Sequence, residues 1–342
     1  MFELDKVSTT HNFFELGGHS LLAMKMFGQL RKEIQVDLPL ACIFELPTIV
    51  QLATKIDVLL EERSFNSTTR TLIQSDIESG HPLSRSQLSM WLIDKLSYGT
   101  AQYNMPGVFS ITGALQITAL QNALAQLVGR HEVLRTVLID DAITAKQYVL
   151  EDYSLDVPIV DLSAKKDVMA CVESFIDAEA NMPFQLNTGL KIRAKIIKTA
   201  PEHHFLLLTL HHIAADGWSI NILTQELEAL YRSTLKNEAA ELPTLDIQYK
   251  DYAHWQHQNI QDGLLDGQVT YWLDFLADHP QVHSLPLDFP RPPERPLEGR
   301  SYKFDIDSKL CKDLTAFCQR KSMTPFMVLH LVYALLVSDQ SG

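Results

Sequence analysis

Two adjacent histidines, His211 and His212, are the residues of this sequence whose setting best suits acid–base chemistry. They follow a continuous apolar run over residues 205–210, which is typical of a central strand buried on both faces of a sheet. Asp216 and Gly217 come shortly afterwards, and leucines at helical spacing begin a few residues later. The pattern HHxxxDG is therefore expected at a strand–loop–helix junction, where loops on a rigid scaffold tend to carry function.

The two histidines are expected to differ in role, because neighbouring side chains on a strand point to opposite faces. Histidine has an ordinary pKa of about 6.5, so an imidazole that reaches a cavity could accept a proton near neutral pH. The same alternation argues against a zinc site built from both histidines and Asp216. Residues 190–198 predict a neighbouring half-buried strand with Lys191 on its polar face. His203 and His204, which precede the apolar run, are expected in a turn.

A second candidate is Ser20, which stands where a helix is expected to begin. Gly17 and Gly18 precede it and allow a tight turn that leaves the serine uncovered. The helix has one apolar face, formed by Ala23, Met26, Phe27, Leu30 and Ile34. Residues 47–60 give a second apolar face, formed by Ile49, Leu52, Ile56 and Leu59. Together these segments predict a small helical bundle, with Ser20 beside the positive end of a helix dipole, where a phosphate group is favoured.

Composition restricts the class of protein. The 342 residues suggest two or three domains, and 42 acidic against 29 basic residues give a formal charge of −13, which argues against nucleic-acid binding. The first residues lack the pattern of a secretory signal, and the longest apolar stretch, residues 326–337, is too short to span a bilayer. The four cysteines have no metal-type spacing. We expect reduced thiols in a cytoplasmic protein, with no metal and no membrane partner.

Two stretches divide the chain. Residues 62–80 are rich in Ser and Thr with little periodic apolar signal, which indicates a linker. Residues 280–296 are rich in proline and are expected to run extended between two lobes.

The segment around Ser20 resembles a known attachment motif. Residues 13–26 read FFELGGHSLLAMKM, which is similar to the 4′-phosphopantetheine attachment motif of peptidyl carrier domains in nonribosomal peptide synthetases. Residues 38–40 and 43–48 look like the later loop and third helix of such a carrier. The resemblance implies a carrier domain over residues 1–62 with a truncated first helix, covalent 4′-phosphopantetheine on Ser20, and a phosphopantetheinyl transferase as partner.

The segment around the histidine pair resembles the condensation domains of the same synthetases, which are relatives of chloramphenicol acetyltransferase. The similar stretches occur in the family's order and cover residues 82–92, 129–136 (GRHEVLRT), 211–219 (HHIAADGWS) and 249–255 (YKDYAHW). The resemblance implies an α+β multidomain chain, in which an α/β condensation domain follows the carrier and the linker at 63–80. Its first lobe is expected over residues 81–260 and part of a second lobe over residues 261–342.

The resemblance also implies a reaction and a set of catalytic candidates. The reaction is amide formation, in which the amine of one carrier-bound aminoacyl thioester attacks the thioester carbonyl of a donor on another carrier. The position of His212 matches the family's catalytic residue, and we expect it to position the amine and receive its proton. His211, Asp216 and Gly217 are the other catalytic candidates. Asp216 is expected to hold the loop through an ion pair with Arg130 or Arg135. Gly217 is expected to offer its N–H to the developing oxyanion.

Three alternatives can be weighed. A cyclisation domain would carry an aspartate-rich motif in place of HHxxxDG and is disfavoured. An epimerisation domain keeps HHxxxDG, but carriers that feed it usually read GGDS, whereas His19 precedes Ser20 here. A non-catalytic carrier or interaction fragment stays open, because condensation domains are usually longer than the matching stretch. We expect the chain to be an excerpt of a synthetase, with neighbouring synthetase domains as partners.

Overall fold

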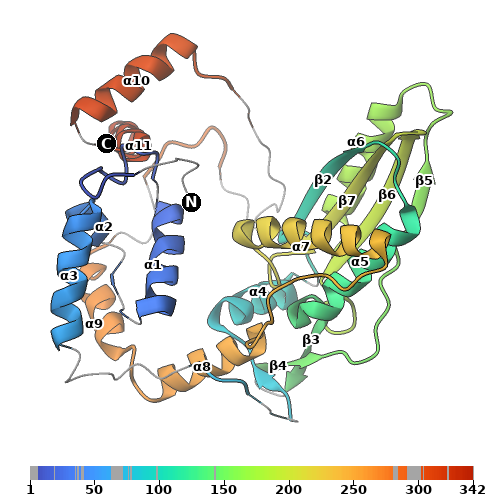
Figure 1. Cartoon of the computed structure of the whole chain (residues 1–342), viewed down its shortest axis with the longest axis horizontal. Coiled ribbons are helices and arrows are strands. Elements are labelled where there is room, and N and C mark those ends of the chain that lie inside the picture. The colour runs from blue at the N-terminus through green and yellow to red at the C-terminus, as the bar shows by residue number, and fades with distance from the viewer. Residues whose placement is uncertain are drawn as a thin grey trace. The chain divides into compact units, whose positions relative to one another are not determined.

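The structure is a computed structural model whose contacts divide the chain into two compact units (Figure 1). The helical unit comprises Met1–Thr69 and Asp278–Gly342, and the sheet unit comprises Arg70–Ala277. The structure describes residues 7–18, 20–34, 36, 38–39, 42–62, 72–75, 77, 79–97, 99–141, 144–279, 284–290, 302, 304–321 and 323–341. Most of the proline-rich stretch expected to run extended, and residues 63–71 of the expected linker, lie outside these residues.

The first helices of the helical unit form the predicted bundle. They are α1 (Ser20–Ile34), α2 (Cys42–Glu45) and α3 (Ile49–Glu62). Their shared core includes Ala23, Phe27, Leu52 and Ile56, which confirms most of the two predicted apolar faces. Ile49 was expected in that core but is 51% exposed, so the buried face of α3 begins one turn later.

Two further helices of the helical unit lie near the end of the sequence. They are α10 (Ser308–Lys321) and α11 (Pro325–Ser341). Among the described residues, no single helix is long and apolar enough to cross a membrane, and α10 and α11 pass that test only as a pair bent by 104°. The four cysteines are free, including Cys311 and Cys318 of α10.

The sheet unit is built on a four-stranded sheet in the order β2-β7-β6-β5 (Figure 1). Its strands are β2 (Asn104–Thr112), β5 (Ile159–Asp161), β6 (Ile192–Ala200) and β7 (His203–His211). β7 pairs antiparallel with β2 and β6, whereas β5 pairs parallel with β6. The apolar run therefore forms a central strand, as predicted. The expectation that His203 and His204 lie in a turn is wrong, because the turn uses only the two preceding residues and both histidines pair with β6.

Helices cover both faces of this sheet, so β7 is buried on both sides. On one face α5 (Ile117–Arg130) and α7 (Gly217–Lys236) pack against alternate residues of β6 and β7. On the other face α6 (Val168–Asn181) packs against the residues in between. The leucine stripe of α7, formed by Leu223, Leu227 and Leu230, is buried as predicted.

A second sheet supports the loop that follows β7. It has the order β1-β4-β3, from β1 (His81–Pro82), β3 (Thr136–Asp141) and β4 (Thr144–Val149). An apolar cluster joins this sheet and Trp91 of α4 (Arg85–Leu96) to Ile213, so Trp91 is a packing residue. The remaining elements of the unit are the short helix η1 (Glu132–Arg135), α8 (Tyr249–Gln261) and α9 (Asp266–Phe275).

Candidate active site

The histidine pair lies where β7 ends and the chain turns towards α7. His211 is the last residue of β7, and its carbonyl oxygen accepts a hydrogen bond from the Ala214 N–H at 2.9 Å. The backbone N–H of His212 donates to the carbonyl oxygen of Tyr103 at 2.9 Å. The loop is therefore fixed by main-chain bonds on both sides of the pair, and the predicted strand–loop–helix junction is confirmed.

His211 points into the protein and supports the loop. Its side chain is 1% exposed and contacts the rings of Phe184 and Tyr103. Its Nδ1 accepts a hydrogen bond from the Ile213 N–H at 3.0 Å, so in the neutral ring the proton is on Nε2. Burial lowers the pKa of His211 to about 4, and the positive charge of Lys191 adds to this effect. His211 is therefore a neutral ring at physiological pH and not a proton acceptor for the reaction.

His212 points the other way and is exposed. Its imidazole forms no hydrogen bond within the described part of the chain, so both ring nitrogens are open to a substrate. The two histidines thus separate as the alternation along a strand requires. The described residues also contain no group of three or more His, Cys, Asp or Glu side chains that could hold a metal ion.

Asp216 begins α7 as its N-cap. Its Oδ1 accepts hydrogen bonds from the Ser219 N–H at 2.8 Å and from the Ser219 hydroxyl at 2.7 Å. The Ser219 Oγ in turn accepts from the Asp216 N–H at 3.2 Å, which completes a capping box. These bonds from Ser219 lower the pKa of the Asp216 carboxyl. Asp216 therefore fixes the start of the helix that follows His212.

The expected ion pair between Asp216 and Arg130 or Arg135 is wrong. The Arg130 Nε donates to Glu226 at 3.0 Å, and Glu226 lies about 15 Å further along the axis of α7 than Asp216. Arg135 instead donates to the carbonyl oxygen of Leu150 and lies over the ring of Tyr153. Both guanidinium groups are therefore bound elsewhere, Arg130 at the middle of α7 and Arg135 at the residue that follows β4.

Gly217 opens α7 with free space around it. A Cβ atom at this position would meet nothing within 4 Å, so no packing contact requires glycine here. The N–H groups in the first turn of a helix have no partner within the helix. The expectation that Gly217 donates its N–H to an oxyanion stays a prediction.

Lys191 was expected on a polar face but is 1% exposed. Its backbone carbonyl accepts from the His211 N–H at 3.0 Å, and its ammonium group donates to the carbonyl oxygens of Gln185 and Gly189. Next along the strand, Arg193 pairs with Glu179 of α6 at 2.8 Å, so this face of β6 is covered by a helix. Burial lowers the pKa of Lys191 to about 7. Lys191 therefore holds the strand end beneath the histidine pair.

Replacing Lys191 by methionine is expected to stabilise the sheet unit at neutral and acidic pH, because it removes the cost of burying an ammonium group. Between about pH 7 and pH 10.5 the unfolded chain keeps this proton and the folded chain releases it. Wild-type stability should therefore rise with pH in that window, by up to about 1.4 kcal/mol per pH unit, and the advantage of Lys191→Met should shrink. Urea unfolding followed by tryptophan fluorescence measures this. An unchanged difference across the window, or an equal effect of the exposed Lys165→Met, would contradict it.

Ser20 is the first residue of α1, as predicted. Gly17 has a φ of +91°, a backbone conformation that favours glycine. A Cβ atom on Gly18 would lie 2.3 Å from the ring of Phe13, so this position also requires glycine. The chain therefore turns tightly before Ser20, and the helix start with its free N–H groups fits an attached phosphodiester.

Comparison with known proteins decides the family. A condensation-domain model matches residues 77–342, and a phosphopantetheine attachment-site model matches residues 2–56. The chain belongs to the condensation-domain family. In front of that domain it carries a phosphopantetheine attachment domain, whose cofactor is bound covalently.

Curated relatives agree with this assignment and are much longer than this chain. Tyrocidine synthase 3 of Brevibacillus parabrevis is 35% identical over 338 residues, which is 99% of this chain but 5% of that protein. Malpibaldin synthetase of Mortierella alpina is 35% identical over 346 residues, which is 100% of this chain but 6% of that protein. The chain therefore spans only a small part of the length of the relatives that it matches.

Solved structures agree as well. The X-domain from teicoplanin biosynthesis superposes with a TM-score of 0.71 at 24% identity, covering 80% of this chain and 60% of that one. The starter condensation domain of rhizomide synthetase gives a TM-score of 0.55 at 21% identity, covering 60% and 49%. These two structures show the fold, so the predicted α+β condensation fold is confirmed.

The RHE segment of the condensation domain holds helices together. Glu226 of α7 accepts from the Arg130 Nε at 3.0 Å and pairs with the His131 Nε2 at 2.6 Å. Burial alone would raise the pKa of Glu226, but these two partners outweigh it and the pKa is lowered. Glu132 pairs with Lys250 of α8 at 2.9 Å. The charged residues of this segment therefore join α5 and η1 to α7 and α8.

Proposed function

We propose that this chain is a segment of a nonribosomal peptide synthetase that carries acyl groups on Ser20 and forms amide bonds at His212. The observation that supports this function best is that the two histidines of the pair lie in different environments. His211 is buried and neutral, whereas His212 is exposed on a loop that main-chain bonds and the Asp216 cap hold in place. An imidazole with free nitrogens on a fixed loop is suited to bind an incoming amine.

The proposed reaction joins a donor acyl thioester to an acceptor amine. The amine nitrogen attacks the thioester carbonyl carbon, the new C–N bond forms, and the C–S bond breaks to release the pantetheine thiolate. His212 orients the amine and takes the proton that it loses, and that proton then passes to the thiolate. The demand on His212 as a base is modest, because an α-amino group has an ordinary pKa of about 8. Gly217 is the proposed donor of an N–H to the carbonyl oxygen as negative charge develops.

We propose the domain boundaries that the motifs imply: a carrier over residues 1–62, a linker over 63–80, a first lobe over 81–260 and part of a second lobe over 261–342. The proposed partners are carrier-bound aminoacyl and peptidyl thioesters, a phosphopantetheinyl transferase and neighbouring synthetase domains. The cytoplasm is the proposed location, which is consistent with four free cysteines.

A two-step experiment tests this function. The chain is first incubated with a phosphopantetheinyl transferase and an acyl-coenzyme A, and intact mass spectrometry measures acylation of the carrier. An aminoacyl pantetheine acceptor is then added and product is measured by mass. Amide product from the acylated chain would support the proposal. A chain that is acylated but gives no product, with or without the rest of its synthetase, would favour a non-catalytic carrier. Inversion of the donor's α-carbon would favour an epimerisation domain.

A further inference from the structure

The end of the expected linker is bound to the sheet unit rather than free of it. The Ser75 N–H donates to the Asp251 Oδ1 at 2.7 Å, and the Gln74 side-chain amide donates to the Asp246 carbonyl oxygen at 2.8 Å. Further along, the Tyr148 hydroxyl donates to the Ser79 carbonyl oxygen at 3.0 Å. Residues far apart in sequence, just before α8, in its first turn and on β4, thus hold the segment at both ends.

Asp251 uses each carboxylate oxygen for a different purpose. Its Oδ2 accepts from the Gln248 N–H at 2.8 Å and so caps the start of α8, while its Oδ1 holds Ser75. The side chain is 2% exposed. Hydrogen bonds to a buried charged group are stronger than those between neutral groups, so the bond to Ser75 stabilises the attachment more than an exposed contact would.

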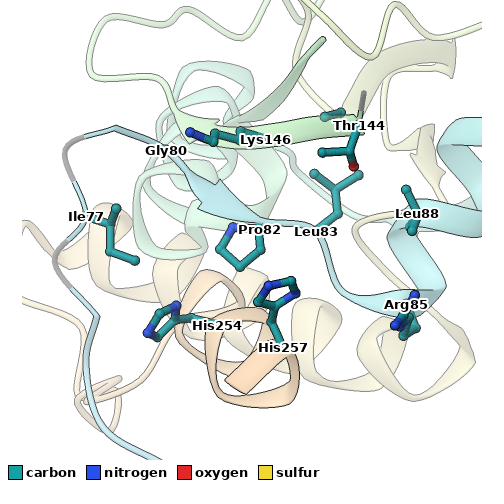
Figure 2. A pocket seen from close by; sticks show the side chains of 11 residues that line it. Ile77, Gly80, Pro82, Leu83, Arg85, Leu88, Thr144, Lys146, His254 and His257 are labelled. Carbon is teal, nitrogen blue, oxygen red and sulfur yellow. The ribbon is translucent and has the colours of Figure 1, made fainter. Parts of the chain in front are cut away.

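The segment borders a cavity of the sheet unit. Ile77 and Gly80 line a cavity of about 480 Å³ together with His254 and His257 of α8. The side chains of Ile77, His254 and His257 are labelled in Figure 2. Such a volume would hold several water molecules, since one occupies about 30 Å³ in the liquid. Ile77 is half-buried, and the hydrogen bonds at Gln74, Ser75 and Ser79 add to the attachment of the segment.

The geometry points to a clamp, in which Asp251 binds the linker at Ser75. The free part of the linker between the carrier and the sheet unit therefore ends near Ser75 and not at β1. This inference rests on the two-domain organisation and is independent of the proposed catalysis. It concerns how far Ser20 can travel from the sheet unit. From the end of α3 at Glu62, twelve residues reach Gln74, a fully extended limit of about 41 Å. Breaking the bonds at Gln74 and Ser75 would free the chain as far as Ser79, which Tyr148 still holds, and would raise that limit to about 58 Å.

Ser75→Pro tests the clamp from the linker side, because it removes the N–H and leaves the Asp251 cap on α8 intact. Asp251→Asn tests it from the other side, since one oxygen becomes an NH₂ group that cannot accept. In the intact chain, limited proteolysis between residues 72 and 80 is expected to become about tenfold faster or more in both variants. Hydrogen exchange of the peptide over residues 77–80 should accelerate in parallel.

The control is Ile73→Pro, which introduces a proline two residues before Ser75 and leaves Ser75 unchanged. The side chain of Ile73 is 70% exposed. Its cleavage rate should stay within about twofold of the wild type, as expected for a surface substitution. Equal cleavage of Ser75→Pro and Ile73→Pro would overturn the clamp. So would acceleration in Asp251→Asn alone, because that outcome would assign the effect to the α8 cap.

Discussion

Replacing His212 by alanine is expected to lower the rate of amide formation by about a hundredfold or more, which is the usual contribution of a positioned acid–base group. The methyl group of alanine can neither orient the amine nor receive its proton. The fold should be unaffected, because His212 is exposed and its imidazole forms no hydrogen bond with the residues that the structure describes, while its backbone N–H donates to Tyr103. The measurement is a single turnover, in which chain acylated on the carrier reacts with a soluble aminoacyl pantetheine.

The matched control for this prediction is His257→Ala, which removes another exposed imidazole of the sheet unit, on α8. It should leave the rate of amide formation within about twofold, because a surface substitution outside the candidate site has little effect. Acylation of Ser20 should be equal in both variants, so that any loss of rate lies in the condensation step. A near-normal rate for His212→Ala would contradict the role assigned to this residue.

The elements that carry the two sites follow from local pattern. A continuous apolar run predicted β7 as a central strand, and the alternation of side chains predicted that His211 and His212 would separate. Glycines before Ser20 and apolar residues after it predicted the turn and helix α1, which the backbone confirms. These features depend on residues that are close together in the sequence. The periodicity of apolar residues predicts such local structure.

Features that depend on distant parts of the chain were missed. Alternation placed Lys191 on a polar face, but α6 covers that face and the lysine is buried. The Ser- and Thr-rich composition indicated a linker, yet Ser75 is held by Asp251, 176 residues away. Asp216 was expected to form an ion pair with an arginine. A serine three residues after Asp216 is instead the pattern of a capping box, which the structure contains. Tertiary contacts override the local pattern at Lys191 and Ser75, whereas a local capping box satisfies Asp216.

Replacing Ser20 by alanine is expected to abolish attachment of 4′-phosphopantetheine completely, because the phosphodiester forms on a hydroxyl oxygen that alanine lacks. Helix α1 should persist, since alanine is the best helix former. Intact mass after incubation with coenzyme A and a phosphopantetheinyl transferase measures the attachment, and circular dichroism checks the helix content.

The matched control is Ser8→Ala, which removes an exposed hydroxyl from the loop before the glycine turn. Full labelling is expected there, because the transferred phosphate requires the helix start and its N–H groups, which follow the turn at Gly17 and Gly18. Labelling that survives in Ser20→Ala would place the attachment on another hydroxyl and remove Ser20 from the carrier function. Because amide formation from this carrier needs the tethered donor, Ser20→Ala should also give no product even though His212 is intact. A donor supplied on a separate carrier should restore product, which would show that the two sites act in sequence and fail independently.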